Sequence, residues 1–359
     1  MKNFVQIIML SVIIASFFLQ SCTEDARRGL RPVPTAFGNL NEIVVVMDAD
    51  MWDRPVGDTL RYYYSSAYPL LPQPEPIFDL RHFTPEELNK DPLRKELRTY
   101  MIVGNLNDEN SPATKMIIND IGKENARKAK EDKDYNSAIG RDKWAKGQLL
   151  IYEFGYSEDE LINILKDNFP AVHKRVNQFD DKKVDAYVYL DGQNKRLEEE
   201  VKQDMDVSLR IPSDYFLAVN DDDVIWMRRE TDETSSNIIL KKIPYTDQSQ
   251  LSKENIIAIR DSIGKQYISS TLPGTYMQTN DVDLPVLTYV TKINGYYTLE
   301  ARGIWEIVDD YMGGAFMSYL ILNPNTNELL FVDGFLHAPG EDKRDLMQYI
   351  EHIIKTIRF

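Results

Sequence analysis

The chain has 359 residues and a formal charge of −15, from 42 lysines and arginines against 57 aspartates and glutamates. Hydrophobic residues make up 43% of it and charged residues 28%, a globular composition that excludes a disordered or fibrous chain. The acidic balance, with no stripe rich in lysine and arginine, also argues against nucleic acid as a partner.

The first 21 residues have the pattern of an export signal. Lys2 supplies a positive charge, and an apolar run from Val5 to Leu19 follows it. A helix of that length would span about 22 Å, which is short of the roughly 30 Å of membrane hydrocarbon. The pattern therefore predicts a signal peptide at residues 1–21 that is cleaved, and not a transmembrane helix.

The apolar run ends at Leu19-Gln20-Ser21-Cys22, which resembles the lipobox of bacterial lipoproteins. In that type of site the cysteine sulfur receives a diacylglycerol, the signal is cut before the cysteine, and the new amine is acylated. Two or more buried acyl chains anchor a protein stably. Cys22 is the sole cysteine of the sequence, so neither a disulfide nor a cysteine-bound metal is expected.

Residues 22–36 are predicted to form a lipidated tether, because they mix proline, glycine and charges. We expect the protein to be anchored by lipid at the outer membrane. The pair Glu24 and Asp25 resembles the acidic export signals of surface-displayed Bacteroidetes lipoproteins. Display on the surface and a location facing the periplasm both remain open.

At roughly 150 residues per domain, the length predicts two domains or one domain of two similar halves. We divide the folded body into an N-terminal half, residues 37–204, and a C-terminal half, residues 205–359. In the first half, apolar runs predict strands at 43–47, 77–80, 99–103 and 148–154. Caps and amphipathic spacing predict helices at 55–64, after 84, at 111–131, at 157–170 and at 171–205 with a break at Gly192.

The second half is predicted to be richer in strands. Strands are expected at 207–211, 215–219, 224–229, 237–243, 285–293, 296–304, 316–322 and 328–336, and helices at 252–263 and 341–357. Asn294-Gly295 is a strong hairpin signal. Because turns join these strands, the sheet should be mainly antiparallel and the fold class α+β. A strand–turn–helix pattern at 149–157 recurs at 329–341, which leaves two related halves or coincidence as alternatives.

Five segments carry a family resemblance: Trp52–Leu60, Leu71–Phe78, Arg302–Trp305, Met312–Phe316 and Phe331–Phe335. Their order and spacing resemble a full-length family of Bacteroidetes lipoproteins, the domain-of-unknown-function family 4837. The resemblance implies lipidation and export. It implies no reaction, because that family has no assigned chemistry.

The sequence lacks the common catalytic motifs, namely G-x-S-x-G, the Walker-A loop, G-x-G-x-x-G and H-E-x-x-H. Its four histidines, His82, His173, His337 and His352, lie far apart in the sequence. A histidine-rich metal site would need all these segments to converge. We therefore expect no metal site and no cofactor.

One local cluster is a candidate cleft. On a strand, the alternation of side chains places Asp333 and His337 on the same face, and an aspartate–histidine pair can orient a general base. Trp305, Gly313 and Gly314 belong to the same candidate cleft. The alternative is structural, with the histidine at a sheet edge and the glycines relieving a bulge.

Two functions follow as hypotheses. The first is a non-catalytic module at the cell envelope that binds a protein or a glycan, since 20 tyrosines, 14 phenylalanines and 4 tryptophans could supply stacking surfaces. The second is a lipid-anchored hydrolase that attacks envelope or dietary polysaccharide through paired carboxylates. An enzyme would need a pocket in which at least one carboxyl has a shifted pKa.

Overall fold

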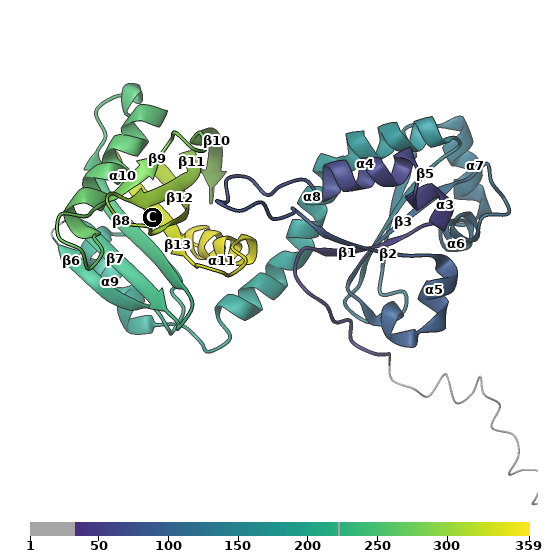
Figure 1. Ribbon diagram of the computed structural model, residues 1–359, viewed down its shortest axis with the longest axis horizontal. Coiled ribbons are helices and arrows are strands. Elements are labelled where there is room, and N and C mark those ends of the chain that lie inside the picture. The colour runs from purple at the N-terminus through teal and green to yellow at the C-terminus, as the bar shows by residue number, and fades with distance from the viewer. Residues whose placement is uncertain (1–32, 222) are drawn as a thin grey trace, which may run out of the picture.

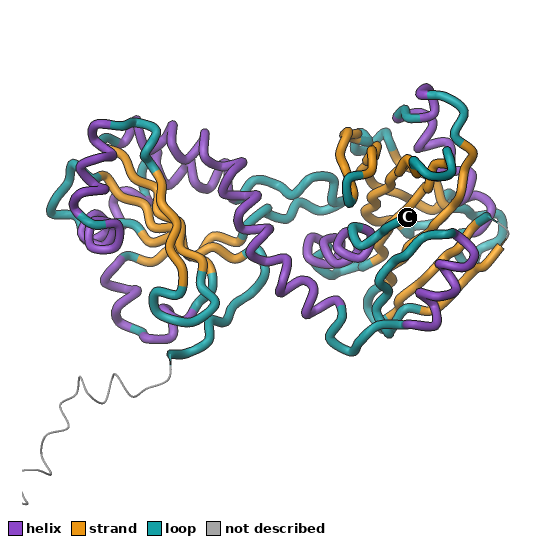
Figure 2. Tube along the Cα trace, turned by 180° about the vertical axis from the view of Figure 1, so that it is seen from behind, coloured by secondary structure: helices purple, strands orange, loops and turns teal. Residues whose placement is uncertain are grey.

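The computed structural model describes residues 33–221 and 223–359. Within these ranges the strands form two sheets, and each sheet belongs to one half of the chain (Figures 1 and 2). The predicted signal peptide, Cys22 and most of the predicted tether lie outside the described residues.

The first sheet has the strand order β2-β1-β3-β5-β4. Its strands are β1 (Glu42–Val46), β2 (Asp79–Phe83), β3 (Thr99–Asn105), β4 (Ser137–Arg141) and β5 (Leu149–Gly155). The pairs β1–β2, β1–β3 and β3–β5 are parallel, and β4 pairs antiparallel with β5. Strands β3 and β5 are buried almost throughout, because helices cover both faces of a parallel sheet.

Helices connect these strands and form the outer layers (Figure 1). They are α3 (Ala49–Trp52), α4 (Pro55–Tyr64), α5 (Pro85–Lys90), α6 (Pro112–Ile121), α7 (Lys123–Glu131) and α8 (Glu158–Val188), with a 3₁₀ turn at Pro92–Glu96. Helices α4 and α8 pack on one face through one apolar core, and α5, α6 and α7 pack on the other through a second core. The first unit is therefore a layered α/β/α sandwich.

The second sheet is antiparallel, in the order β10-β11-β12-β13-β8-β7-β6, with β9 paired to β11. Its strands are β6 (Phe216–Asp221), β7 (Val224–Glu230), β8 (Ser235–Pro244), β9 (Met277–Asn280), β10 (Leu287–Ile293), β11 (Tyr296–Ile307), β12 (Gly313–Asn323) and β13 (Glu328–His337). Helices α9 (Lys195–Met205) and α11 (Arg344–Ile354) cover one face, and α10 (Lys253–Tyr267) covers the other.

The α+β class is confirmed, and the antiparallel prediction holds for the second sheet. The first sheet differs because helices, and not hairpin turns, join most of its strands. The strand–turn–helix pattern that recurs in the sequence involves β5, which has a parallel partner, and β13, whose two partners are antiparallel. The two units thus differ in strand pairing, which does not support a duplication.

Several predicted boundaries were wrong. Helix α8 runs through Pro170 without ending there, and the predicted strand at 207–211 is absent from the strands of the described residues. The predicted helix at 111–131 is split at Gly122, whose φ of +87° is the left-handed conformation that glycine adopts easily. The predicted hairpin at Asn294-Gly295 is confirmed between β10 and β11.

Helix α9 packs against the core of the second unit through Leu197, Val201 and Met205. We therefore propose that the chain passes between its units at about residues 189–194, after α8, and not at 204–205. Gly192, with a φ of +95°, lies in this segment as the predicted break.

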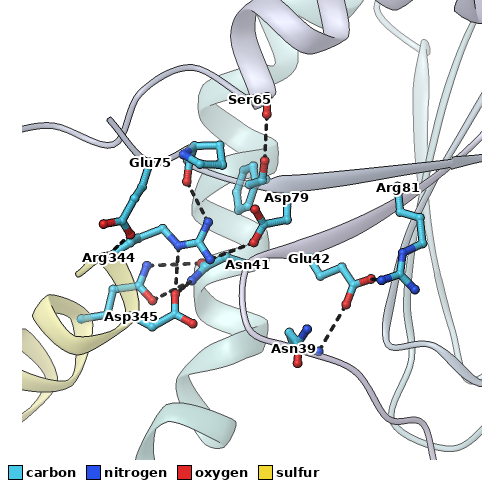
Figure 3. Close-up of polar contacts among 12 residues, drawn as sticks. Asn39, Asn41, Glu42, Ser65, Glu75, Asp79, Arg81, Arg344 and Asp345 are labelled. Carbon is cyan, nitrogen blue, oxygen red and sulfur yellow. Dashed lines mark hydrogen bonds and ion pairs between the residues drawn. The ribbon is translucent and has the colours of Figure 1, made fainter. Parts of the chain in front are cut away.

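The two units contact each other through α8, α11 and the proline-rich loop before β2 (Figure 1). In that loop Glu75 accepts hydrogen bonds from the backbone N–H groups of Lys343 (2.7 Å) and Arg344 (2.8 Å), which begin α11. The Arg344 guanidinium in turn binds Asp79 at 2.9 Å and the Pro76 carbonyl at 2.7 Å (Figure 3). A carboxylate of the first unit thus caps a helix of the second.

Candidate functional site

A cavity of about 400 Å³ lies at the junction of the two units. We call it the interdomain pocket, and its walls are formed by Asn41, Tyr68, Pro69, Ile77, His173, Asn177, Asp180, Asp181, Val184, Tyr289, Arg302, Gln348, Glu351, His352 and Lys355. Ligand sites in proteins often lie at such boundaries between domains.

Two helices supply most of the polar lining. From α8 come residues 173, 177, 180 and 181, together with the apolar Val184, and from α11 come residues 348, 351 and 352, followed by Lys355 directly after its end. Both sets recur at intervals of three or four residues, which places each of them on one face of its helix. Helices α8 and α11 lie in contact, so the two polar faces meet at the pocket.

A charged network forms one wall of the interdomain pocket. Glu351 binds the guanidinium of Arg302 and the amine of Lys355, each at 2.7 Å. Burial disfavours the charged form of Glu351, but these two cations outweigh it and lower its pKa to about 2. Arg302 also donates to the Tyr68 hydroxyl at 3.3 Å, and burial raises the pKa of Tyr68 to about 12.

Asn41 joins the two units at the edge of the pocket. This buried residue has a φ of +57°, and its side-chain amide donates to Asp345 and to Gln348 of α11, both at 2.9 Å (Figure 3). Its backbone N–H donates to Asp180 at 3.1 Å. Burial raises the pKa of Asp180, although the nearby Arg98 guanidinium, at 2.9 Å, favours its charged form.

Two of the histidines line the pocket, although their distance in sequence argued against convergence. Burial lowers the pKa of His173, whose ring lies beside Phe78 and Phe169, so its neutral form is favoured. His352 is 2.9 Å from Asp185, which also binds Arg210 at 2.7 Å. Within residues 33–221 and 223–359, no group of three or more His, Cys, Asp or Glu side chains could hold a metal ion.

The residues of the candidate cleft lie elsewhere, in the second sheet. Trp305 and His337 have ring centres 6.1 Å apart, and a ring nitrogen of His337 is 3.2 Å from the Gly313 carbonyl. At Gly314 a Cβ would lie 1.9 Å from the Leu336 carbonyl oxygen, so only glycine fits there. The structure brings these four residues together, and none of them lines the interdomain pocket.

Asp333 takes part in a different set of contacts. It lies in the core and binds Arg260 of α10 at 3.2 Å, with both side chains 1% exposed. Ser318 donates to the same carboxylate oxygen at 2.5 Å. Burial raises the pKa of Asp333, and the charge of Arg260 opposes this. Its hydrogen bonds go to Arg260 and Ser318 rather than to His337, so its role in these contacts is structural.

Sequence reasoning missed the interdomain pocket because its walls come from segments far apart in the chain. A weak signal was present in the polar residues that recur every three or four positions in the α8 and α11 sequences. No pattern in the sequence predicted that these two helix faces would lie against each other.

In the part of the chain that the structure describes, no helix has the length and hydropathy needed to span a membrane.

Three known structures show weak likenesses to this chain. The Saccharomyces cerevisiae Ran-binding protein Mog1p is 11% identical over 42% of this chain and 89% of its own, with a TM-score of 0.29. LpqN of Mycobacterium tuberculosis, involved in cell envelope biogenesis, is 12% identical over 42% and 81%, with a TM-score of 0.27. Human StAR-related lipid transfer protein 5 is 10% identical over 44% and 91%, with a TM-score of 0.23. No curated protein matches the chain.

Two family models match the sequence. A domain of unknown function, DUF8532, matches residues 36–186, and a second, DUF4837, matches residues 194–356. The first two segments of the family resemblance, Trp52–Leu60 and Leu71–Phe78, fall in the DUF8532 match, and the other three fall in the DUF4837 match. Each structural unit is therefore matched by one family model of unknown function.

Proposed function

We propose that this chain is a non-catalytic binding protein and that its interdomain pocket holds a saccharide unit of a glycan. The observation that carries the proposal is the lining of the roughly 400 Å³ cavity. Tyr68 and Tyr289 offer aromatic surfaces, and Asn177 and Gln348 offer amides. Sugar rings stack on aromatic faces, and their hydroxyls pair with amide and carboxylate groups.

The charges of the pocket favour binding over hydrolysis. A glycosidase needs a carboxyl group that holds its proton near neutral pH. Glu351 has a pKa lowered to about 2 by Arg302 and Lys355, against the effect of burial, so it has no proton to give. Asp180 accepts the Asn41 N–H and lies against Arg98. Burial raises the pKa of Asp180, but its contacts with Arg98 and with the Asn41 N–H favour its charged form and hold it within the protein.

Calorimetric titration of the protein with a panel of neutral oligosaccharides of two to six sugars tests this proposal. We expect Tyr289→Ala to weaken binding about two- to tenfold, since an aromatic contact is worth about 0.5–1.5 kcal/mol. Asn177→Ala should weaken it as well. Tyr62→Ala is the matched control, because Tyr62 is an exposed tyrosine outside the pocket. Failure of the whole panel to bind would refute the saccharide assignment.

We further propose that the protein is a lipoprotein of the Bacteroidetes type, anchored at the outer membrane through Cys22. Support comes from the lipobox-like Leu19-Gln20-Ser21-Cys22 at the end of an apolar run. Metabolic labelling with a clickable palmitate should mark the wild-type chain and leave Cys22→Ala unmarked. A Cys22→Ala chain that stays equally firmly in the membrane fraction would contradict the anchor.

A further inference from the structure

A second and larger groove, of about 960 Å³, lies on the first unit. Its charged lining is almost entirely positive, and Asp142 is the only acid in it. We call it the basic groove and define it by the side chains of Arg98, Arg141, Lys146, Arg175, Lys182 and Lys183.

The basic groove is assembled from separate elements. Arg98 directly precedes β3, Arg141 ends β4, and Lys146 follows in the loop before β5. The other three cations lie on α8, where residues 175, 182 and 183 face the groove. This concentration of positive charge stands out on a chain whose formal charge is −15.

Four of these six cations are exposed and are not paired with an acid in the described part of the protein. The side chains of Arg141, Lys146, Arg175 and Lys182 make no ion pair or hydrogen bond with other described residues. The single acid, Asp142, accepts the backbone N–H groups of Gly147 (2.5 Å) and Gln148 (3.1 Å), and its charge offsets only one of the six positive charges. These bonds, and after them the charges of Arg141 and Lys146, lower the pKa of Asp142.

Two arginines of the groove lie against one aromatic ring. The guanidinium carbons of Arg98 and Arg141 lie 4.9 and 5.4 Å from the ring centre of Phe179. Arg98 also pairs with Asp180 through one terminal nitrogen, while its other terminal nitrogen, Nη1, is buried without a hydrogen-bond partner. Guanidinium groups fixed on an aromatic ring lose little freedom when they bind a phosphate.

We propose that the basic groove binds a compact ligand that carries two or more phosphate groups. Arginine and lysine together are the usual recognition groups for phosphate. The groove is much larger than a single phosphate, and its cations come from both α8 and the strand ends. The acidic remainder of the chain repels a long polyanion such as nucleic acid, so a small anion is favoured.

Two sources could supply such phosphate groups: a soluble phosphorylated compound or the headgroups of anionic lipids. The groove is bordered by residues 35–38, near the start of the described chain. A lipid source would place this face against a membrane. The chemistry of recognition is the same in both cases, and the experiment separates them.

The test titrates inorganic pyrophosphate into the full chain in a neutral detergent and measures binding by calorimetry. The groove variant is Arg175→Ala with Lys182→Ala, and the matched control is Lys166→Ala with Lys174→Ala. The control removes two exposed cations from the same helix, outside the groove. We expect the groove variant to weaken binding at least tenfold, and the control to change it less than threefold. Circular dichroism checks that both variants fold.

The second arm measures sedimentation with phosphatidylglycerol and with phosphatidylcholine vesicles, using both variants in a Cys22→Ser background. Loss of phosphatidylglycerol binding in the groove variant alone identifies the lipid headgroup as the source. Equal vesicle binding of both variants, with pyrophosphate binding lost only in the groove variant, identifies a soluble compound. The proposal is overturned if pyrophosphate does not bind, or if both variants lose binding equally.

Discussion

At the scale of single residues, the buried pair of Arg260 and Asp333 should be the most sensitive point of the second unit. Replacing Asp333 by Ala would leave the Arg260 charge buried without its partner, since both side chains are 1% exposed. We expect Asp333→Ala to lower the free energy of unfolding by about 3–5 kcal/mol, measured by urea denaturation.

Two further variants test whether the unpaired buried charge causes this loss of stability. Asp342→Ala, at an exposed position, should change stability by less than about 0.5 kcal/mol. The double variant Arg260→Met with Asp333→Leu should lose less stability than Asp333→Ala, because it removes both charges. A loss below about 1 kcal/mol for Asp333→Ala would show that this ion pair does not hold the core together.

Glu153 gives the first unit a dependence on pH. It lies on β5, is 1% exposed, and accepts one hydrogen bond, from Asn168 at 2.7 Å. Burial raises its pKa from 4.5 to about 8 in the folded protein. A raised pKa means that the folded state binds the proton more tightly than the unfolded state. The stability from this group is therefore complete below about pH 4.5 and is lost as the pH rises through about 8.

Glu153→Gln removes this titration while keeping the shape of the side chain. We expect the variant to be more stable than the wild type at about pH 8.5, by a few kcal/mol, and nearly equal to it at about pH 4.5. Thermal unfolding followed across this pH range measures the difference. A wild type and a variant with parallel pH profiles would mean that Glu153 keeps an ordinary pKa.

At the scale of elements, α8 contains an internal destabilising residue. Pro170 lies inside this helix of 31 residues and is exposed, and a proline at such a position removes one backbone hydrogen bond and crowds the preceding turn. We expect Pro170→Ala to raise the free energy of unfolding by about 1–3 kcal/mol. Lys174→Ala, at another exposed position of α8, should change it by less than about 0.5 kcal/mol. Destabilisation by Pro170→Ala would contradict this account.

The sequence predicted most elements, and the errors have physical causes. The hairpin at Asn294-Gly295 was found because its turn chemistry is local. The end predicted at Pro170 was wrong because packing of α8 against α4 and the first sheet outweighs the local effect of proline. The parallel pairing of the first sheet was missed because it depends on contacts between strands that helices separate.

At the scale of the whole molecule, the docking of the two units depends on a few polar contacts. Glu75 caps α11 across the boundary, and Arg344 binds Asp79 and the Pro76 carbonyl (Figure 3). Interfaces between domains are often polar enough to allow relative motion. Removal of the cap should therefore loosen the two units and leave the core of each intact.

We expect Glu75→Ala to cost about 1–2 kcal/mol of stability and to separate calorimetric unfolding into two transitions. The same variant should also lower the affinity of the interdomain pocket for its ligand, because residues of both units line this pocket. Glu86→Ala, at an exposed position of α5, is the control and should unfold like the wild type. One unchanged transition for Glu75→Ala would mean that docking does not rely on this cap.

The sequence by itself determined the α+β class, most helices and strands, and the hairpins of the second sheet, because those features follow from local spacing and turn chemistry. The export signal and Cys22 remain predictions of the sequence alone. Only the tertiary structure decided where the charges and rings meet. His173 and His352 share one pocket, and six cations from distant segments share one groove, on a chain that is acidic in sum. Which distant segments lie together depends on how the helices and strands pack, and the local sequence patterns do not predict that packing.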